Sequence, residues 1–530
     1  MINIYNKNFT PVSKNQISFK GPLDSVITTT LRTLDTNPMV NAVGLDLISM
    51  VGPRTYVDTK ERNKYAGAET FFREFTGTLI VCLSASYFAK WIAALANRYI
   101  NPNVKINPKS WLSDDSINFL NSQWSKTKNT NGYVTSVLEN ISGRDGKIVR
   151  NFKDIDWKNI EWIDEKRWNN LNWDSPKFKN IHNNLKDKQS IIALIERLIN
   201  DKNISSNDRK NLIQILELRL TNALKSDKIF AGNNLSTSMR NLLRDMTDLG
   251  KDVFKNNSIN TEKALNKLLK INKIKSSGAL ALASTLGLFN QYINRKITEK
   301  RTGSKGFVGD LDYKNQVKNK KSNKDNSKQF IFEKILASLG MAAMAIAVMK
   351  VKSPKDFMKK LEFTGPVTSG NTIKTVYAST LIGRFLASDT KDELRETVTR
   401  DYLGFLNWLV LGGFASKGIA NILDINKENL FNISQKGKGI KHWLNDVTLK
   451  SHNEIATQGK NFASKNMWRV NLAHIGGLAY STIALGVLLP KLNILITQNK
   501  QRNKINNVEF DKANKQIHFK SRPTIKEFLS

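Results

Sequence analysis

The fold class that this sequence predicts is all-α, with polytopic membrane helices arranged as an internally duplicated helix pair and a soluble helical domain inserted into it. Three observations lead to this prediction. One motif occurs twice at a fixed spacing, apolar segments long enough to cross a bilayer recur along the chain, and a polar, tryptophan-rich stretch interrupts the first copy of the repeat.

The repeated motif reads Glu-Thr-x-x-Arg-Glu-Phe-x-Gly at positions 69–77 and Glu-Thr-x-x-Arg-Asp-Tyr-x-Gly at positions 396–404, so the numbering offset between the copies is 396 − 69 = 327. A second pair of matching segments, 278–298 and 477–497, follows at an offset of 477 − 278 = 199. Two colinear matches indicate one duplicated helical unit. The smaller second offset means that the first copy contains an additional stretch of chain, of length 327 − 199 = 128.

Several apolar segments match the hydrocarbon thickness of a bilayer, which takes about 20 helical residues to cross. They are rich in Gly, Ala and Ser, which let membrane helices approach closely, and residues 79–89 show no amphipathic stripe. If five segments span, the second unit is inverted relative to the first, whereas a sixth span at 373–388, which contains Arg384, makes the two units parallel. The five segments are 75–96, 276–296, 333–351, 402–423 and 470–490.

The stretch 101–270 differs from the rest because it has no long apolar run. It holds six tryptophans, and residues 191–224 read as two amphipathic helices with a serine or asparagine cap between them. A soluble helical domain here accounts for the additional length of the first copy. Basic and aromatic residues interleave at 151–182, but acidic residues nearly cancel the charge, which disfavours a phosphate-binding groove. The six tryptophans are Trp111, Trp124, Trp157, Trp162, Trp168 and Trp173.

These patterns divide the chain into eight segments. They are a polar N-terminal segment (1–42), the first half of the first repeat (43–100), the inserted basic Trp-rich domain (101–270), the second half of the first repeat (271–298), a basic flexible linker (299–329), an extra helix and connection (330–372), the second repeat (373–498) and a basic C-terminal tail (499–530).

The composition is strongly basic, with 82 Lys+Arg against 46 Asp+Glu and a formal net charge of +36. Such a charge favours anionic partners, although a Lys- and Asn-rich composition is also what an AT-rich genome produces. The single cysteine, Cys82, rules out a disulfide within the chain and a cysteine-based metal site. The N-terminal segment 1–27 lacks the apolar core of a cleavable signal peptide, so internal segments would insert into the membrane, which we expect to be a bacterial inner membrane.

Eight charged residues occupy matched positions in the two copies. The acid and the arginine one helical turn later form a favourable helix-surface pair. Arg73 and Lys90 would lie about 25 Å apart along a helix, so these cations are expected to mark the two membrane interfaces. The alternative is a lysine that faces a cavity and binds an anion. The matched charges are Glu69, Arg73, Glu74 and Lys90 in the first copy and Glu396, Arg400, Asp401 and Lys417 in the second.

Four glycines and one histidine complete the candidate residues. Gly77 and Gly404 follow the matched arginines by one turn, and Gly287 and Gly486 match in the second pair of segments, so all four are predicted at close helix packing. His474 lies inside the last apolar segment, where it could relay protons or contact a polar substrate. A hydrogen bond to a neighbouring carbonyl is the simpler role for it.

We found no catalytic motif, no metal-ligand spacing and no phosphate-binding loop, so no catalytic residue, metal or cofactor is expected. The sequence therefore predicts a transporter-like or scaffold protein of the membrane. Its expected partners are the lipid bilayer, in particular anionic lipids, and a second copy or another membrane protein. The alternative is a soluble, basic helical protein that binds nucleic acid or has a structural role, and an unrecognised membrane enzyme stays open.

Overall fold

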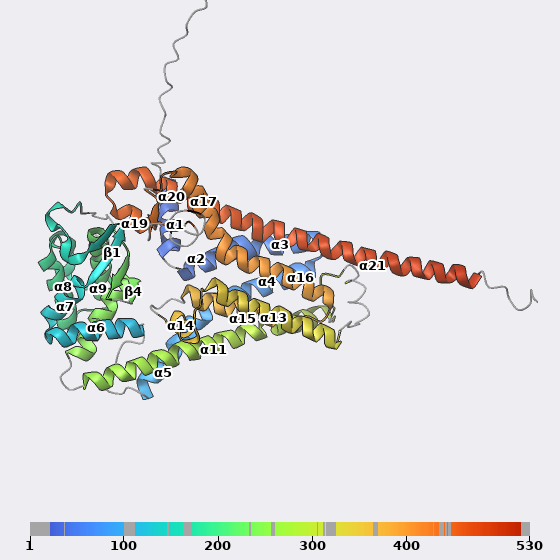
Figure 1. Cartoon of the computed structure of the whole chain (residues 1–530), viewed down its shortest axis with the longest axis horizontal. Coiled ribbons are helices and arrows are strands. Elements are labelled where there is room, and N and C mark those ends of the chain that lie inside the picture. Colours follow the sequence, from blue (N-terminus) through green and yellow to red (C-terminus); the bar gives the residue numbers. More distant parts are fainter. Residues whose placement is uncertain are drawn as a thin grey trace, which may run out of the picture.

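The computed structural model describes most of the chain and is nearly all-α (Figure 1). Parts of the predicted linker 299–329, the first half of the N-terminal segment 1–42 and the end of the tail lie outside the described residues, as do Trp111 and Trp168. The described residues are 22–36, 38–99, 112–145, 148–162, 171–232, 235–255, 260–304, 306–310, 313, 325–363, 369–427, 429–433, 439, 443 and 447–520.

Two long continuous helices contain the two copies of the motif. Each contains a π-helical turn directly after the motif, η2 and η9, and these turns begin at Ile80 and Asn407, which have the same numbering offset as the motif itself. A π-helical turn adds a residue to the helix and redirects the side chains that follow it. The first helix comprises α4 (Lys64–Leu79), η2 (Ile80–Ser84) and α5 (Ala85–Tyr99), and the second comprises α16 (Lys391–Leu406), η9 (Asn407–Leu411) and α17 (Gly412–Leu423).

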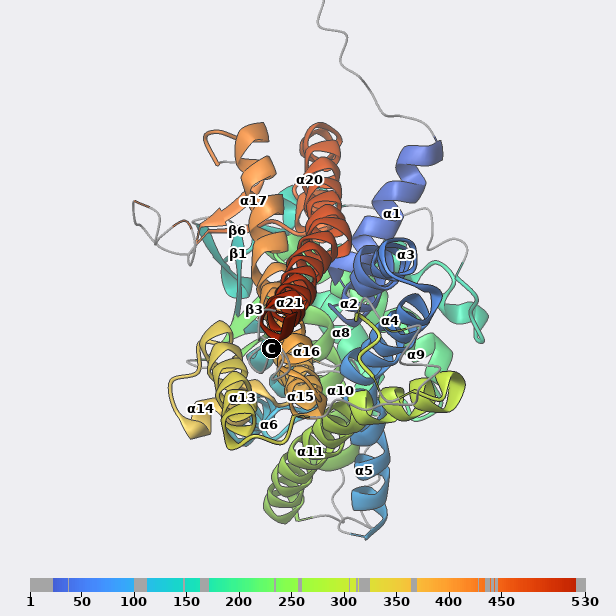
Figure 2. The ribbon, with the colours of Figure 1, turned by 90° about the vertical axis from the view of Figure 1, so that its right-hand side faces the viewer.

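Each of these helices packs against one further long helix, α5 against α11 and α17 against α20. Figure 2 shows the α17–α20 pair and the α5–α11 pair on opposite sides of the molecule, with α3, α4, α15, α16 and α21 between them. The predicted C-terminal tail continues α21 as helix to Lys520. The further helices are α11 (Thr261–Thr302) in the first pair and α20 (Lys460–Ser481), η10 (Thr482–Leu488) and α21 (Leu489–Lys520) in the second.

The remaining helices of this helical body connect the two pairs. Helices α13 and α15 lie antiparallel, since Lys334 near the start of α13 donates to the carbonyl of Leu386 near the end of α15. Helices α4 and α16 begin at the same end, where Arg62 pairs with Glu396 at 2.7 Å, so the two run in parallel. These elements are α1 (Pro22–Thr36), α2 (Pro38–Leu45), η1 (Asp46–Val51), α3 (Gly52–Glu61), α13 (Lys328–Val348), α14 (Pro354–Lys360) and α15 (Gly370–Ala387).

Residues 112–255 fold around a hydrophobic core that the first turns of α11 complete with Ala264, Leu265 and Leu268. The described part of this domain contains five α-helices and a four-stranded antiparallel sheet of order β2-β1-β3-β4, which the sequence did not reveal because each strand has only four or five residues. Ser205 caps α9 by accepting from the amide of Asp208 at 3.0 Å. The elements are α6 (Asp114–Thr127), α7 (Thr130–Glu139), β1 (Ile141–Asp145), β2 (Ile148–Asn151), α8 (Lys188–Asn200), α9 (Ser206–Leu224), β3 (Lys228–Ala231), β4 (Leu235–Ser238), α10 (Met239–Leu249) and η8 (Gly250–Phe254).

A shorter connection, residues 424–459, joins α17 to α20 and touches the 112–255 domain. It contains a two-stranded sheet, β5 (Phe431–Ile433) with β6 (Val447–Leu449), and the helix α19 (His452–Thr457). Asn222 donates to the carbonyl of Thr457 at 3.2 Å, and Ser451 donates to Asp227 at 2.9 Å. The domain therefore rests against the same end of the helical body as this connection, as Figure 1 shows.

Within the described residues, three helices are long and apolar enough to cross a membrane by length and composition. They are Lys64–Ala96, Lys328–Val348 and Asn461–Asn503, and they overlap three of the five predicted segments. The segments 276–296 and 402–423 are helical but are not among the three.

Polar contacts also join the domain to α14 and to the segment that follows it. Lys359 pairs with Asp115 at 2.8 Å, and the amide of Asp114 donates to Glu362 at 3.2 Å. Partial burial, together with the nearby carboxylates of Asp114 and Asp115, raises the pKa of Glu362 from 4.5 to about 7, and Lys275 partly opposes this. The folded chain therefore keeps a proton here that the unfolded chain has already lost.

We predict that Glu362→Gln weakens the pH dependence of stability. Because the folded pKa is raised, Glu362 stabilises the folded state least at high pH, and stability falls as pH rises from about 4.5 to about 7. Melting temperatures of the detergent-solubilised full chain, measured across this window, should fall less steeply in the variant. Exposed Glu262 supplies the control, Glu262→Gln. An unchanged slope in Glu362→Gln would contradict the prediction.

Candidate functional site

Four buried charged residues form the centre of the helical body. Arg54 contacts Glu74 at 3.3 Å, and Arg384 contacts both Glu74 at 3.3 Å and Asp401 at 3.2 Å. None of the four is more than 6% exposed. The guanidinium of Arg384 thus links the acid of α4 to the acid of α16, and we call these residues the central ion-pair cluster.

The two motif arginines extend this cluster in the same way on both sides. Arg73 Nε lies 3.3 Å from Glu74, its neighbour in sequence, and Arg400 Nε lies 3.1 Å from Asp401. In both cases one carboxylate also receives an arginine from a preceding helix, α3 or α15. Arginine suits this role because its planar guanidinium can donate to two carboxylates at once.

The remaining matched charges differ between the two helices. Glu396 is buried and accepts from Arg62 and from the hydroxyl of Thr497, at 2.7 and 2.9 Å. Glu69 instead lines a polar cavity of about 440 Å³ together with Arg295. The structure therefore gathers four of the eight matched charges in and around one cluster and places the two first acids in different surroundings.

Two of the candidate glycines lie beside the cluster. A Cβ atom at Gly77 would lie 3.4 Å from Nη2 of Arg384, and one at Gly404 would lie 3.4 Å from Nη2 of Arg54. Each glycine thus leaves space for an arginine that comes from a helix preceding the other motif. A larger side chain at either position would meet a guanidinium that already has its carboxylate partners.

The other two glycines lie where two helices approach each other closely. A Cβ at Gly287 would lie 2.6 Å from Oγ1 of Thr380, and one at Gly486 would lie 2.5 Å from the carbonyl oxygen of Ser49 and 2.7 Å from Cβ of Pro53. Gly287 therefore packs on α15, and Gly486 packs on η1 and α3. Thr380 and Pro53 have the numbering offset of the two motifs, so the two contacts use matching positions.

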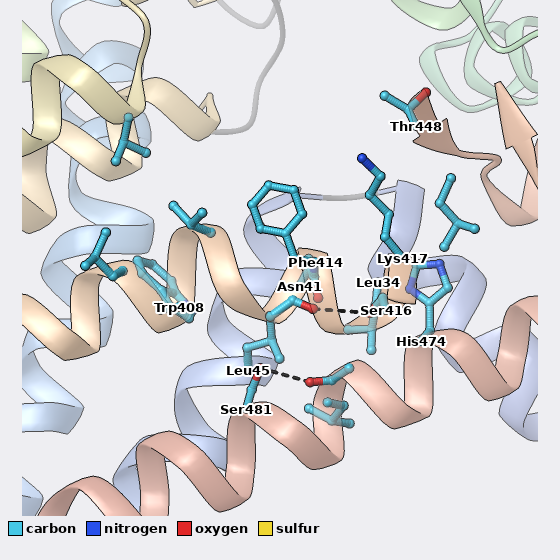
Figure 3. Close-up of a pocket in the computed structure, with 18 of the residues that line it drawn as sticks. Leu34, Asn41, Leu45, Trp408, Phe414, Ser416, Lys417, Thr448, His474 and Ser481 are labelled. Carbon is cyan, nitrogen blue, oxygen red and sulfur yellow. Dashed lines mark hydrogen bonds between the residues drawn. The ribbon is translucent and has the colours of Figure 1, made fainter. Parts of the chain in front are cut away.

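A cavity with a volume of about 900 Å³ opens in the helical body between α2, α17, α20 and the end of α13 (Figure 3). Its wall is largely apolar and includes Leu45, Trp408 and Phe414. Three lysines also line it, and none of the described lining residues is an aspartate or glutamate. These lysines are Lys350, Lys374 and Lys417.

Lys417, one of the matched charges, is held in place at this cavity. Its ammonium donates to the carbonyl of Trp443 and lies 4.6 Å from the centre of the Trp443 ring and 5.5 Å from that of Phe414. The side chain is 9% exposed, whereas its sequence counterpart, Lys90, is exposed on α5. A position at the membrane interface stays a prediction for Lys90. The surroundings of Lys417 match the alternative, a lysine that faces a cavity.

His474 also lines the cavity, from α20. Its ring lies 5.0 Å from the ring of His452 in α19, and Nε2 of His452 lies 3.0 Å from Oδ1 of Asn471. The described residues include no group of three or more His, Cys, Asp or Glu side chains that could hold a metal ion. The cavity therefore offers cations, an imidazole and apolar walls as its binding groups.

Sequence reasoning overlooked several residues of both sites. The sequence patterns do not single out Arg54, Lys350 or Lys374, and they include Arg384 only as part of the possible sixth span at 373–388. A charged residue within an apolar helix indicates a buried partner, and this signal could have identified Arg384.

Comparison with known proteins identifies no relative. The chain matches no protein-family model, and no curated protein or solved structure is significantly similar to it.

We predict that Arg384→Met strongly destabilises the protein, because it leaves the buried carboxylates of Glu74 and Asp401 without their shared cation. Breaking a buried ion pair costs about 3–5 kcal/mol, whereas an exposed pair contributes about 0–1 kcal/mol. Denaturant unfolding in detergent should show this loss. The control is Arg197→Met, which breaks the half-exposed pair between Arg197 and Asp201.

A second variant separates the ion pair from simple loss of packing. Among the described residues, Asp401 keeps only Arg400 as an ion-pair partner in Arg384→Met. Adding Asp401→Asn removes this under-compensated buried carboxylate and should recover part of the lost stability. Equal losses in Arg384→Met and Arg197→Met would contradict a stabilising role for the central ion-pair cluster.

Proposed function

We propose that this chain is an integral, multi-pass membrane protein whose helical body crosses the bilayer and whose 101–270 domain lies in water on one side. The distribution of exposed apolar side chains is the observation that carries the proposal. Among the described residues of the domain, only Ile148 and Val149 are exposed large hydrophobics, whereas the helical body exposes many. One chain thus has two surfaces that suit two solvents.

Helix α13 gives the sharpest case. Only 11% of the most apolar 18-residue stretch of this helix is buried inside the protein. Phe332, Leu336 and Leu339 are 59–64% exposed. Exposed apolar surface costs roughly 25 cal/mol per Å² in water, so such a helix is unfavourable on a water-facing surface. Lipid removes this cost. Exposed large apolar side chains also occur along α11, for example Phe289 and Ile293, and along α21 at Leu492 and Leu495.

We further propose that the helical body arose from a duplicated unit. The motif, the π-helical turns and the contacts of Gly287 and Gly486 all use positions related by one of the two numbering offsets of the repeat. In each unit an arginine from a preceding helix and an arginine of the motif share one carboxylate. The parallel direction of α4 and α16 supports two units related by a rotation about an axis along the helices.

The 101–270 domain is then an insertion into the first unit. It connects α5 to α11, while the shorter segment 424–459 makes the corresponding connection from α17 to α20. Both connections lie at the same end of the helical body and touch through Asn222 and Thr457. A soluble domain placed in a loop leaves the packing of the helices on either side of it unchanged.

A transporter-like role fits these features better than a passive scaffold. Buried charges inside an apolar helical body are costly, and they mark functional pathways in membrane proteins. Internal repeats that meet near buried polar groups are common in transporters. This likeness is an analogy of architecture. The cavity beside the second helix pair supplies a place for a bound molecule. The alternative, a soluble basic protein that binds nucleic acid, is disfavoured by the exposed apolar helices.

Membrane fractionation tests the proposal directly. We predict that the expressed chain stays in the membrane pellet after an alkaline carbonate wash and enters solution only with detergent. A variant with Phe332→Lys, Leu336→Lys and Leu339→Lys should insert poorly, because a lysine near the bilayer centre costs about 3 kcal/mol. Release of the wild-type chain by carbonate alone would contradict a membrane-spanning role and favour the soluble alternative.

The matched control places the same charges on the domain. Substituting Ile148 and Val149, the domain's exposed apolar residues, with lysine should leave the protein in the carbonate-resistant pellet. If both lysine variants disappear from the pellet to the same extent, the substitutions cause general misfolding. The comparison then no longer supports the proposal.

A further inference from the structure

We infer that the cavity of about 900 Å³ between α2, α17, α20 and the end of α13 binds an anionic lipid, an amphiphile with an acyl chain and a negatively charged head group. This inference rests on the proposed membrane location, which supplies the ligand, and it names the substrate class of that function. Lys374 and Lys417 bind the head group, and the apolar wall between Leu45 and Phe414 holds the chain.

Charge is the first argument. Among the described residues that line the cavity, three are lysines and none is an aspartate or glutamate, and within the same part of the chain neither Lys374 nor Lys417 forms an ion pair. Cations gathered in a partly buried place repel one another and lose hydration, so an anion between them is stabilised on both accounts. The central ion-pair cluster shows the contrast, because every arginine there contacts a carboxylate.

The apolar wall is the second argument. A free inorganic anion would need only the cations, yet most of the lining side chains are apolar. The volume of about 900 Å³ is at the large end of the range typical of organic ligand sites, and a lipid chain fills such a space. Figure 3 shows Phe414 and Lys417 on the same stretch of α17 and His474 across from them on α20.

The position of the lysines is the third argument. Lys350 is the second residue after the end of α13, and Lys417 lies about two turns before the end of α17. Both lie at the end of the helical body that contacts the 112–255 domain, where the head-group region of the bilayer would be. An acyl chain that enters beside these lysines would extend toward the middle of the helices.

Native mass spectrometry of the full chain in mild detergent tests the inference. The probes are phosphatidylglycerol, phosphatidylcholine with the same acyl chains, and palmitate. We expect phosphatidylglycerol or palmitate to bind at least tenfold more tightly than phosphatidylcholine, because a charge-assisted contact to the anion is lost with the zwitterionic lipid. Comparison of phosphatidylglycerol with palmitate distinguishes a phosphate head group from a carboxylate.

Variants locate the binding. Lys374→Gln with Lys417→Gln should weaken binding of the anionic probe about tenfold or more, and Lys374→Arg with Lys417→Arg should largely preserve it. The matched control, Lys90→Gln with Lys296→Gln, removes two exposed lysines from the first helix pair and should change little. Gly413→Phe keeps all three lysines and fills the cavity from a position with open space around it, so it should also reduce binding.

Phosphatidylcholine binding as tight as that of both anionic probes would overturn the inference, as would full binding in the Lys374→Gln, Lys417→Gln and Gly413→Phe variants. Melting temperatures measured on the same samples show whether each variant is folded, and the arginine pair and Gly413→Phe provide a test even if the glutamine pair unfolds. If the binding results contradict the inference but the protein resists the carbonate wash, only lipid binding is contradicted and the proposed membrane location stands. Release by carbonate contradicts the proposed membrane function.

Discussion

The central ion-pair cluster is the interaction on which the rest of the helical body depends. Desolvating an arginine or a carboxylate costs several kcal/mol, and only close, well-oriented partners compensate for this. The helices that carry these groups must therefore cross within ion-pair distance. Gly77 and Gly404 leave space for the guanidinium groups at this crossing. Beyond it, the π-helical turns lead into α5 and α17, which diverge to opposite sides of the molecule.

The divergence of α5 and α17 beyond this crossing also explains where a binding cavity can form. The end of the first helix pair is joined by a whole domain, whereas the second pair is joined by a short hairpin and α19. Lys90 is exposed, and its counterpart Lys417 lines the cavity. If the two units share an origin, as we propose, the first has become a site for the inserted domain and the second a site for a ligand.

The sequence predicted the long helices well because apolar runs of this length leave few alternatives in water or lipid. It also located the matched arginines and acids, since the repeat drew attention to them. It did not predict that Arg54 and Arg384 complete the cluster, because the partners of a buried charge come from helices distant in sequence. The four-stranded sheet was missed for a related reason. Its two hairpins are joined through β1 and β3, which are separated in sequence by α8 and α9, and the strands are too short to show a period.

Spin-label accessibility in a reconstituted bilayer measures most directly whether lipid or water contacts the helical body. The single cysteine, Cys82, is fully buried, so Cys82→Ala gives a suitable background. Labels at Leu339 on α13 and at exposed Lys202 on the domain then report the two surfaces. We predict that the label at 339 collides mainly with oxygen, which concentrates in lipid, and the label at 202 mainly with a water-soluble nickel chelate. Equal access of the chelate to both labels would contradict the account.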